Sequence, residues 1–499
     1  MVYDLLIIGG GVNGTGIARD AAGRGLSVVL CEKDDFAEGT SSKSSKLVHG
    51  GLRYLEYYEF RLVREALIER EVLLRSAPHI IWPLRFLLPH SPEQRPAWMV
   101  RLGLLLYDHL GGRKILPASR GLRLNSVPEG AVLKPQFQRG FEYSDCWVDD
   151  ARLVVLNALD AAARGAKIMP RTMLVSARRE DGRWVAELVA SDGTRSSLEA
   201  RAIINAAGPL VDEVQGRGLS QNDGPLVRRV KGSHIIVPKF FVGERAFILQ
   251  NDDGRVIFII PYQGDLALIG TTDITLSGDE PAETITDAET DYLLAAVNRY
   301  LIQPLARSDI RASYAGVRPL HEDHAANASA VSRDYVLDVK SEGGAAPVLS
   351  VFGGKITTFR KLAEHALAQL QPWFAHMAPP WTADASLPGG DIPGADFAGF
   401  TKQLAAQYPW LPTAMLTHFA RLYGTRARDL LGTSTSLADL GQHFGANLYE
   451  REIRFLVAQE WAQTGEDVLM RRTKYYLRLN ADEQAAVAAF VAQVQAGAL

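Results

Sequence analysis

The first 32 residues carry the pattern that most constrains the fold of this chain. A short apolar run precedes Gly9, Gly11 and Gly14, which fit the G-x-G-x-x-G fingerprint of a dinucleotide-binding β-α-β unit. Gly9 permits a tight turn, Gly11 leaves space for a pyrophosphate, and Gly14 allows close packing of helix on sheet. The next apolar run ends at Glu32, whose carboxylate suits a ribose hydroxyl. We therefore expect a dinucleotide whose pyrophosphate meets the N-terminus of the first helix.

Composition excludes several other classes of protein. The 499 residues are 47% hydrophobic and 22% charged, which fits a globular chain of about two to four domains. A net charge of −3 gives no indication of nucleic-acid binding. No apolar run reaches the roughly 18 residues of a membrane-spanning helix, and the fingerprint starts too early to leave room for a signal peptide. The two cysteines form no C-x-x-C pair, so we expect no metal site and a reducing, cytoplasmic compartment.

Hydrophobic periodicity predicts a discontinuous α/β architecture. Helical spacing occurs at 59–77 and 151–164, and a later strand enters a glycine turn at Gly208. Short alternating strands at 226–345 predict a mainly antiparallel sheet. Proline and glycine pairs near 379–394 mark a boundary before a helical tail. We expect a Rossmann-like nucleotide-binding domain (1–77, 145–215 and 346–385), interrupted by a substrate domain (78–144 and 216–345) and followed by a helical domain (390–499).

Two segments favour FAD over NAD, which the fingerprint alone does not distinguish. A run of hydroxyl and cationic side chains at 40–46 suits a pyrophosphate and the polar edge of a flavin. A turn at Gly353 and Gly354 opens a late helix, where N–H groups and Lys355 are suited to stabilise negative charge on a reduced flavin. Taken singly, each segment also fits an ordinary surface loop or a plain strand–helix turn.

Several motifs resemble the signatures of the FAD-dependent glycerol-3-phosphate dehydrogenases, close to their bacterial aerobic, respiratory branch. The resemblance runs from the N-terminus through the helical tail. The segments that carry it are 44–56 (SSKLVHGGLRYLE), 141–152 (FEYSDCWVDDAR), 231–234 (KGSH), 270–273 (GTTD), 316–320 (GVRPL) and 353–361 (GGKITTFRK).

This resemblance implies a flavoprotein dehydrogenase that oxidises sn-glycerol 3-phosphate to dihydroxyacetone phosphate. Hydride passes to FAD, and a quinone is the final acceptor. The family also implies a homodimer in the cytoplasm, bound peripherally to the inner face of the cell membrane. The residues expected to bind FAD are Gly9, Gly11, Asn13, Gly14, Glu32, Thr40, Ser41, Ser42, Ser45, Lys46, Leu47, Gly208, Gly353, Gly354, Lys355, Ile356 and Thr357.

Such a substrate carries a phosphate that needs fixed cations. Arginine binds phosphate through paired hydrogen bonds. Arg318, in a Gly-Val-Arg-Pro turn, is the first candidate, and Arg53 is the second. Tyr54 and Thr271 lie in the same motif segments, and we expect them to contact the substrate as well.

Oxidation also removes a hydroxyl proton, which requires a base of near-neutral pKa and therefore suits histidine. His49 and His234 lie in the motif segments, and the sequence leaves open which of them is the base. Arg318 and Lys355 are further catalytic candidates, because cations offset negative charge near the flavin or on substrate oxygens.

Two other functions fit the residues. A related FAD-dependent amino-acid or amine oxidase shares the fingerprint and the two-domain plan, so the fold alone does not decide. A non-catalytic FAD-binding scaffold with a helical tail for a partner is the second alternative. The set of histidine, arginine and lysine candidates argues against the scaffold.

The best local candidate for a membrane contact is the segment 95–114. Its apolar stretch is about 13 residues long, too short to span a bilayer but long enough to lie in the interface. Trp98 and Tyr107 suit the headgroup level, and the flanking arginines suit anionic lipid. An ordinary buried helix is the alternative. The basic run 471–474 either assists this contact or caps a helix.

Overall fold

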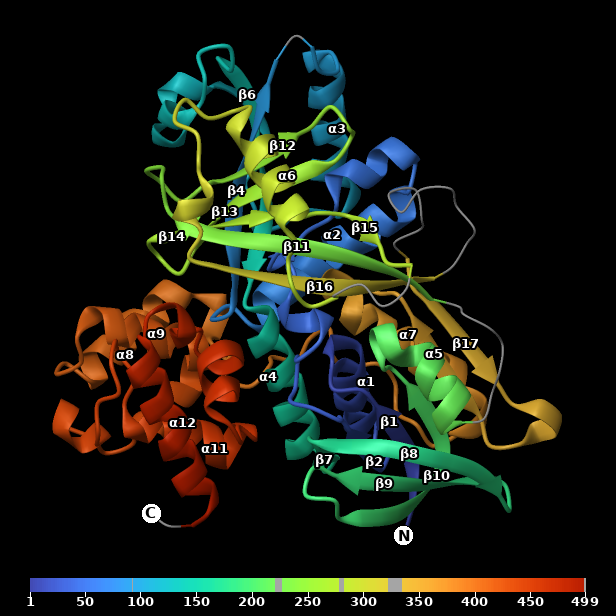
Figure 1. Ribbon diagram of the computed structural model, residues 1–499. Coiled ribbons are helices and arrows are strands. Elements are labelled where there is room, and N and C mark those ends of the chain that lie inside the picture. The colour runs from blue at the N-terminus through green and yellow to red at the C-terminus, as the bar shows by residue number, and fades with distance from the viewer. Residues whose placement is uncertain (92, 220–226, 278–281, 322–333, 498–499) are drawn as a thin grey trace.

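The computed structural model describes residues 1–91, 93–219, 227–277, 282–321 and 334–497. Figure 1 shows a lower sheet with helices, which holds the N-terminus, and an upper sheet above it. The C-terminal part forms a helical unit beside α4 (Asp150–Ala163). Each sheet is assembled from segments that lie far apart in the sequence. The expected α/β class, with an interrupted nucleotide-binding domain and a helical tail, is confirmed.

Parallel strands form the centre of the first sheet. β1 (Val2–Ile8) lies between β10 (Arg195–Asn205) and β2 (Val28–Cys31), and all three are parallel. The strand order in the described part of the chain is β17-β18-β10-β1-β2-β7, and β9 pairs with both β10 and β8. The remaining members are β7 (Lys167–Met169), β8 (Thr172–Glu180), β9 (Arg183–Ala190), β17 (Val336–Lys340) and β18 (Val348–Phe352).

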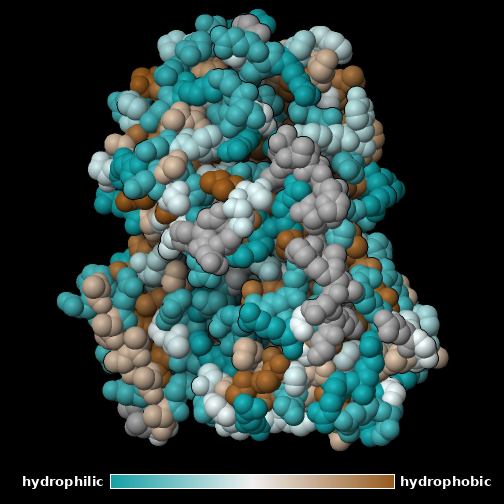
Figure 2. Space-filling view, turned by 45° about the vertical axis from the view of Figure 1, so that its right-hand side comes forward, coloured by the Kyte–Doolittle hydropathy of each residue, from teal (hydrophilic) through white to brown (hydrophobic). Residues whose placement is uncertain are grey.

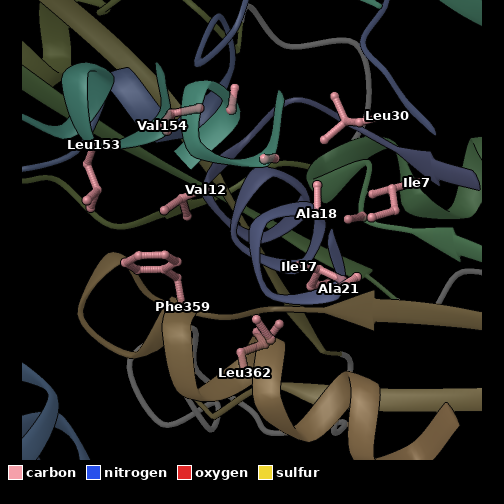
Figure 3. Packing of buried hydrophobic residues seen from close by; sticks show 14 of the residues in the cluster. Ile7, Val12, Ile17, Ala18, Ala21, Leu30, Leu153, Val154, Phe359 and Leu362 are labelled. Atoms are coloured by element: carbon pink, nitrogen blue, oxygen red, sulfur yellow. The ribbon is translucent and has the colours of Figure 1, made fainter. Parts of the chain in front are cut away.

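Three helices pack together against the first sheet. α1 (Val12–Gly23) contacts both α4 and α7 (Phe359–Leu370). Figure 3 shows the apolar side chains of β1, α1, α4 and α7 that meet in this core. A Cβ at Gly16 would lie 2.6 Å from the ring of Phe359. The small residues of α1 therefore let its neighbours approach closely, which fixes the helix whose N-terminus faces the nucleotide.

The second sheet is mainly antiparallel, as expected. Its described strands follow the order β15-β11-β14-β13-β12-β4-β6-β3, with β16 paired to β11 and β5 paired to β6. The strands are β3 (Leu47–Val48), β4 (Ile81–His90), β5 (Arg120–Arg123), β6 (Arg139–Val148), β11 (Val227–Pro238), β12 (Ala246–Gln250), β13 (Val256–Tyr262), β14 (Leu266–Gly270), β15 (Ile274–Thr275) and β16 (Ala312–His321).

Helices cover both faces of the second sheet. α6 (Asp287–Asn298) contributes to the core on one face, and α2 (Phe60–Ser76) and α3 (Ala97–Leu110) contribute to the core on the other. A short α5 (Val211–Glu213) follows β10. The helical unit has a hydrophobic core of its own. Its helices are α8 (Phe397–Gln407), α9 (Thr413–Tyr423), α10 (Ala427–Leu431), α11 (Glu450–Glu460) and α12 (Ala481–Gln495).

The sheets divide the chain differently from the expected domain boundaries in three places. β3 lies within 1–77 but pairs with β6 in the second sheet. β6 continues past the expected boundary at residue 145. β17 lies within 216–345 but pairs with β18 in the first sheet. Local patterns predict strands and not their distant partners, so these pairings were not visible in the sequence.

The segment 95–114 contains α3, whose apolar residues divide between two environments. Trp98 is 66% exposed and Leu102 is 57% exposed, whereas Leu104 and Tyr107 are buried. The expectation that Tyr107 lies at a membrane surface is therefore wrong, because its hydroxyl donates to Asp145 inside the core. Within the described residues, no helix combines the length and apolar character needed to cross a bilayer.

Candidate functional site

A cavity of about 570 Å³ lies between the two sheets. Ile8, Cys31 and Ala206 line it at or just after the carboxyl ends of β1, β2 and β10. Residues of β11 and β16 from the second sheet line it as well. Open α/β sheets bind ligands at the carboxyl ends of their parallel strands, and pockets commonly form between domains. The predicted nucleotide and substrate residues thus face one shared space.

The glycine fingerprint brings backbone close to the cavity. Gly9 has a φ of +110°, and a Cβ there would lie 2.4 Å from the carbonyl oxygen of Ala206. A Cβ at Gly14 would lie 1.9 Å from the carbonyl oxygen of Gly9, so α1 can begin directly against the turn. Gly11 is the N-cap of α1 and lines the cavity. This arrangement presents a helix N-terminus to the ligand, as a pyrophosphate requires.

Glu32 lies at the end of the second parallel strand, where a ribose is expected. Its carboxylate accepts hydrogen bonds from the backbone N–H groups of Gly10, at 2.6 Å, and Asp34, at 2.9 Å. Burial raises the pKa of Glu32, and these two N–H groups act in the opposite direction. The side chain is therefore fixed in orientation at the cavity wall.

Asn13 and the serine-rich loop complete the nucleotide end of the cavity. Nδ2 of Asn13 donates to the carbonyl oxygen of Gly353 at 3.2 Å, which links α1 to the late Gly-Gly turn. Its buried Oδ1 has no hydrogen-bond partner among the described residues. The backbone N–H of Val12 donates to Oγ of Ser41 at 3.0 Å. A buried acceptor without a donor, a helix N-terminus and glycine turns around one cavity fit FAD.

Arg318 is held in a fixed orientation at the wall formed by the second sheet. Its Nη1 lies 2.7 Å from Oδ1 of Asp273, and its Nη2 donates to Oγ1 of Thr271 at 3.2 Å. The side chain of Arg318 is 25% exposed, and the residue lines the cavity. A guanidinium that is oriented before the ligand arrives binds an anion with less loss of entropy.

Two further cations line the same cavity. Nζ of Lys355 lies 3.8 Å from the ring centre of Tyr54, which is a cation–π contact. Arg53 lies one residue earlier, and its guanidinium donates to the hydroxyl of Tyr57 at 3.1 Å. The structure therefore brings the adjacent residues Arg53 and Tyr54 together with Lys355, which lies some 300 residues later in the sequence.

His49 lines the cavity with its backbone anchored on the late helix start. Its N–H donates to Oγ1 of Thr357 at 3.1 Å, and its ring contacts Phe258 edge-on. Burial lowers the pKa of His49; Asp145 opposes the shift and Lys355 adds to it. The imidazole is consequently neutral at pH 7 and able to accept a proton.

His234 is more enclosed than His49. Its ring stacks on Tyr314 with ring centres 4.8 Å apart, and its Nε2 lies 2.8 Å from Oγ of Ser45. Burial, together with the positive charges of Arg318 and Lys46, lowers the pKa of His234 well below its ordinary value. Its Nδ1 is buried without a hydrogen-bond partner in the described part of the chain.

Most of the residues predicted from the sequence line this cavity. They are His49, Arg53, Tyr54, His234, Thr271, Arg318, Lys355, Gly9, Gly11, Asn13, Glu32, Thr40, Ser41, Ser45, Leu47, Gly208, Gly353, Gly354, Ile356 and Thr357. Three others lie outside the lining: Gly14, Ser42 and Lys46. Lys46 is buried and pairs instead with Asp150, at 2.8 Å.

Sequence reasoning missed several residues of the site. Asp273 orients Arg318, and Tyr314 stacks on His234. Lys43 and Ser44, which belong to the predicted run 40–46, line the cavity as well. Asp273 stands in a quoted motif, so the need of an arginine for an acidic partner was a signal that could have identified it. Tyr314 lay in no motif, and its place depends on the pairing of β11 with β16.

Comparisons with known proteins place these features in context. Residues 4–359 match the family model of FAD dependent oxidoreductases, and residues 381–499 match the C-terminal domain of alpha-glycerophosphate oxidase. A D-erythritol 1-phosphate dehydrogenase of Brucella abortus is 59% identical, over 97% of this chain and 96% of the relative. A glycerol-3-phosphate dehydrogenase of Pseudomonas aeruginosa is 56% identical, over 97% of this chain and 94% of the relative.

A solved structure has a similar fold. The glycerol-3-phosphate dehydrogenase from Bacillus halodurans, complexed with FAD, superimposes with a TM-score of 0.77 and 25% identity. The match covers 99% of this chain and 94% of that one, so it includes both sheets and the helical unit.

Proposed function

The chain belongs to the family of FAD-dependent oxidoreductases, and we propose that it oxidises sn-glycerol 3-phosphate to dihydroxyacetone phosphate. FAD, which the fingerprint and the serine loop led us to expect, is confirmed as the cofactor by the family match. Flavin supplies the hydride acceptor for an alcohol oxidation.

The observation that carries the proposal is that the three predicted cations line the nucleotide cavity, where Lys33, Lys43, Arg229 and Arg255 lie as well. Arg53, Arg318 and Lys355 all line it, and Asp273 fixes the orientation of Arg318. A phosphate dianion uses several cations at once, whereas a single carboxylate uses one arginine fork. The set thus favours a phosphorylated substrate over the amino acid or amine of the rival oxidases.

Proton removal is assigned to His49. Nε2 of His234 is already engaged by Ser45, while none of the described residues hydrogen-bonds to the ring of His49. A neutral ring nitrogen of His49 accepts the hydroxyl proton of the substrate. Arg318 and Lys355 hold the anionic phosphate of the substrate. His234 stacks on Tyr314 and, with it, shapes the substrate end of the cavity.

D-erythritol 1-phosphate is the second candidate substrate, because the Brucella abortus relative named for it is 59% identical. Both molecules carry a phosphate ester with a secondary alcohol on the neighbouring carbon, and erythritol 1-phosphate has one further CHOH carbon. The same three cations and the same base suit both molecules. Chain length, and not reaction type, separates the two candidates.

Anaerobic mixing with each substrate tests the proposal through the flavin absorbance. Glycerol 3-phosphate should bleach the flavin, and D-erythritol 1-phosphate should bleach it more slowly at equal concentration. Faster bleaching by the erythritol compound reverses the assignment of the substrate. Bleaching by amino acids or amines alone supports the rival oxidase, and a flavin that no compound bleaches supports the scaffold.

We further propose that the electrons pass to a membrane quinone and that α3 forms the membrane contact of a peripheral homodimer. Several large apolar side chains of α3 are exposed: Trp98, Met99, Leu102, Leu105 and Leu106. α3 packs beside the 3-10 helix Leu52–Tyr57, which contributes cavity residues. Figure 2 shows one face of the molecule, where hydrophilic residues predominate and apolar residues form small separate patches. The exposed apolar residues of α3 recur at the spacing of one helix face, and such a face is a candidate contact surface.

A further inference from the structure

Lys474, a buried lysine of the helical unit, connects this unit through a set of ion pairs to the loop 40–46 of the cavity. The sequence left the basic run 471–474 as either a membrane contact or a helix cap, and the structure buries all four residues. Arg471 and Arg472 both pair with Asp35, at 2.6 Å. Lys474 pairs with Asp149, which caps the N-terminus of α4 by accepting from the backbone of Arg152. The run therefore faces the first sheet and its helices instead of solvent.

Lys474 belongs to a group of four buried charges that sum to zero. Asp149 is followed directly by Asp150, and Asp150 pairs with Nζ of Lys46 through both carboxylate oxygens, at 2.8 and 2.9 Å. Lys474 interacts electrostatically with three charged side chains, those of Asp149, Lys46 and Asp150. We call these four residues the charge quartet. Without Lys474, the group would carry a buried excess negative charge, which is costly.

The charge quartet binds the loop 40–46 on the side of the loop that faces α4. Oδ2 of Asp150 accepts from Oγ of Ser44 at 2.8 Å, and Nζ of Lys46 donates to the carbonyl oxygen of Ser42 at 2.9 Å. From the opposite side, the hydroxyl of Tyr314 donates to the carbonyl oxygen of Ser44 at 2.6 Å. The loop is thus fixed between α4 and the second sheet.

The fixed loop presents Ser45 to the substrate end of the cavity. Oγ of Ser45 lies 2.8 Å from Nε2 of His234, and both residues line the cavity. His234 stacks on the same Tyr314 that binds the loop. A contact between the helical unit and α4 is therefore connected, bond by bond, to the position of His234.

We propose that Lys474 is a positioning residue of the active site: by completing the charge quartet, it holds the loop 40–46 in the conformation that contacts FAD and presents Ser45 to His234. This inference rests on the proposed role of that loop in the cofactor cavity. It gives the helical unit, through its buried basic run, a task in the reaction centre. The predicted effect is electrostatic, so it depends on the balance of charge and not on the shape of the lysine.

The test uses full-length holoenzyme with three sets of substitutions. Lys474→Met leaves the quartet with an excess negative charge. Lys474→Met combined with Asp149→Asn restores neutrality, and asparagine still caps α4. Arg478→Met is the matched control, because Arg478 also joins the helical unit to the rest of the chain, through Asp265 in the turn between β13 and β14. Its ion pair involves neither the quartet nor the loop.

Two measurements need no substrate. The first is release of FAD from diluted holoenzyme, followed by the rise in free-flavin fluorescence. The second is hydrogen–deuterium exchange of the peptide that contains 40–46. Lys474→Met should release FAD about 10-fold faster or more and increase exchange in this peptide. The neutral double variant should return both values to near wild type, and Arg478→Met should leave both unchanged.

Three results overturn the inference. The first is wild-type FAD release and exchange in Lys474→Met. The second is a folded double variant that releases FAD as fast as Lys474→Met, which assigns Lys474 a packing role. The third is equal effects of Arg478→Met, which indicates general loosening of the helical unit. If Lys474→Met does not fold, the double variant alone decides by its FAD release. An enzyme inactive on glycerol 3-phosphate would remove the proposed substrate and leave these measurements valid.

Discussion

Nη1 of Arg318 reaches Oδ1 of Asp273 across the central strand β11, at 2.7 Å. The strand between them offers no side chain at the crossing point, because residue 232 is glycine. A Cβ at Gly232 would lie 2.4 Å from Nη2 of Arg318 and 2.6 Å from Oγ1 of Thr271. The glycine of the Lys-Gly-Ser-His motif therefore leaves space on the face of the sheet. The side chain of Arg318 occupies this space and faces the cavity.

Arg318→Ala should lower kcat/KM for glycerol 3-phosphate about 10- to 100-fold, because a charged hydrogen bond contributes about 1.5–3 kcal/mol. Flavin content should stay at the wild-type level, since the nucleotide end of the cavity is untouched. Steady-state kinetics with a soluble dye acceptor measure the effect. Arg307→Ala is the control, because Arg307 pairs with Asp287 and Asp291 at the surface. Normal oxidation by Arg318→Ala would place this arginine outside the site.

The sequence predicted those parts of the site whose residues contact close neighbours in the chain. The fingerprint glycines and Glu32 act within one β-α-β unit, so their spacing reports their geometry. Asp273 and Gly232 serve Arg318 only because β11 lies between β15 and β16, and strand order is a long-range property. The burial of Lys474 could not be predicted for the same reason. Its partner Asp149 lies 325 residues earlier in the chain, so the sequence did not show that this lysine belongs to a buried ion pair.

His49→Ala should slow flavin reduction about 10²- to 10⁴-fold at saturating substrate, since it removes the proton acceptor. His234→Ala should act mainly on substrate binding and cofactor occupancy, because its Nε2 is engaged by Ser45. Anaerobic stopped-flow absorbance separates the two effects. The reverse pattern would assign the base to His234. Near-wild-type rates in both variants would remove histidine from the mechanism.

The pH dependence of flavin reduction should report the lowered pKa of His49. Burial lowers this pKa below its ordinary value of 6.5, and a base works only in its neutral form. The rate at saturating substrate should therefore stay constant as the pH falls from 8 through about 6.5 and decline only below it. Stopped-flow reduction across this range gives the profile. A decline that begins above pH 6.5 would contradict the assignment.

Because Glu460 forms a buried ion pair with Arg152, the free energy of unfolding should decrease at acidic pH. Burial would raise the pKa of Glu460, but the guanidinium groups of Arg152 and Arg426 outweigh it and lower the pKa to about 2. A depressed folded-state pKa contributes stability above the unfolded value, about 4.3, and loses it as the pH falls toward 2. The contribution at pH 7 is roughly 3 kcal/mol.

Glu460→Gln tests this contribution by thermal unfolding at several pH values. The difference in Tm between wild type and variant should be large at pH 6 and shrink steadily from pH 4.5 downward. Glu180→Gln is the control, because Glu180 is exposed and pairs with Arg178 at the surface. A difference that stays constant with pH would show that the glutamate is not charged in the folded state.

The last prediction concerns the membrane contact of α3. Trp98, Leu102 and Leu105 are exposed, whereas Leu104 is buried, so only the exposed three belong in the test. Replacing them with serine should weaken sedimentation with anionic liposomes at least about 10-fold, because each large apolar side chain contributes about 1.5–3 kcal/mol when fully buried. Activity with a soluble dye acceptor should be retained. Val242→Ser with Ile302→Ser is the matched control, since both residues are exposed and neither belongs to α3. If both variants sediment like wild type, the membrane contact lies on another surface; if only the control loses binding, that surface includes Val242 or Ile302.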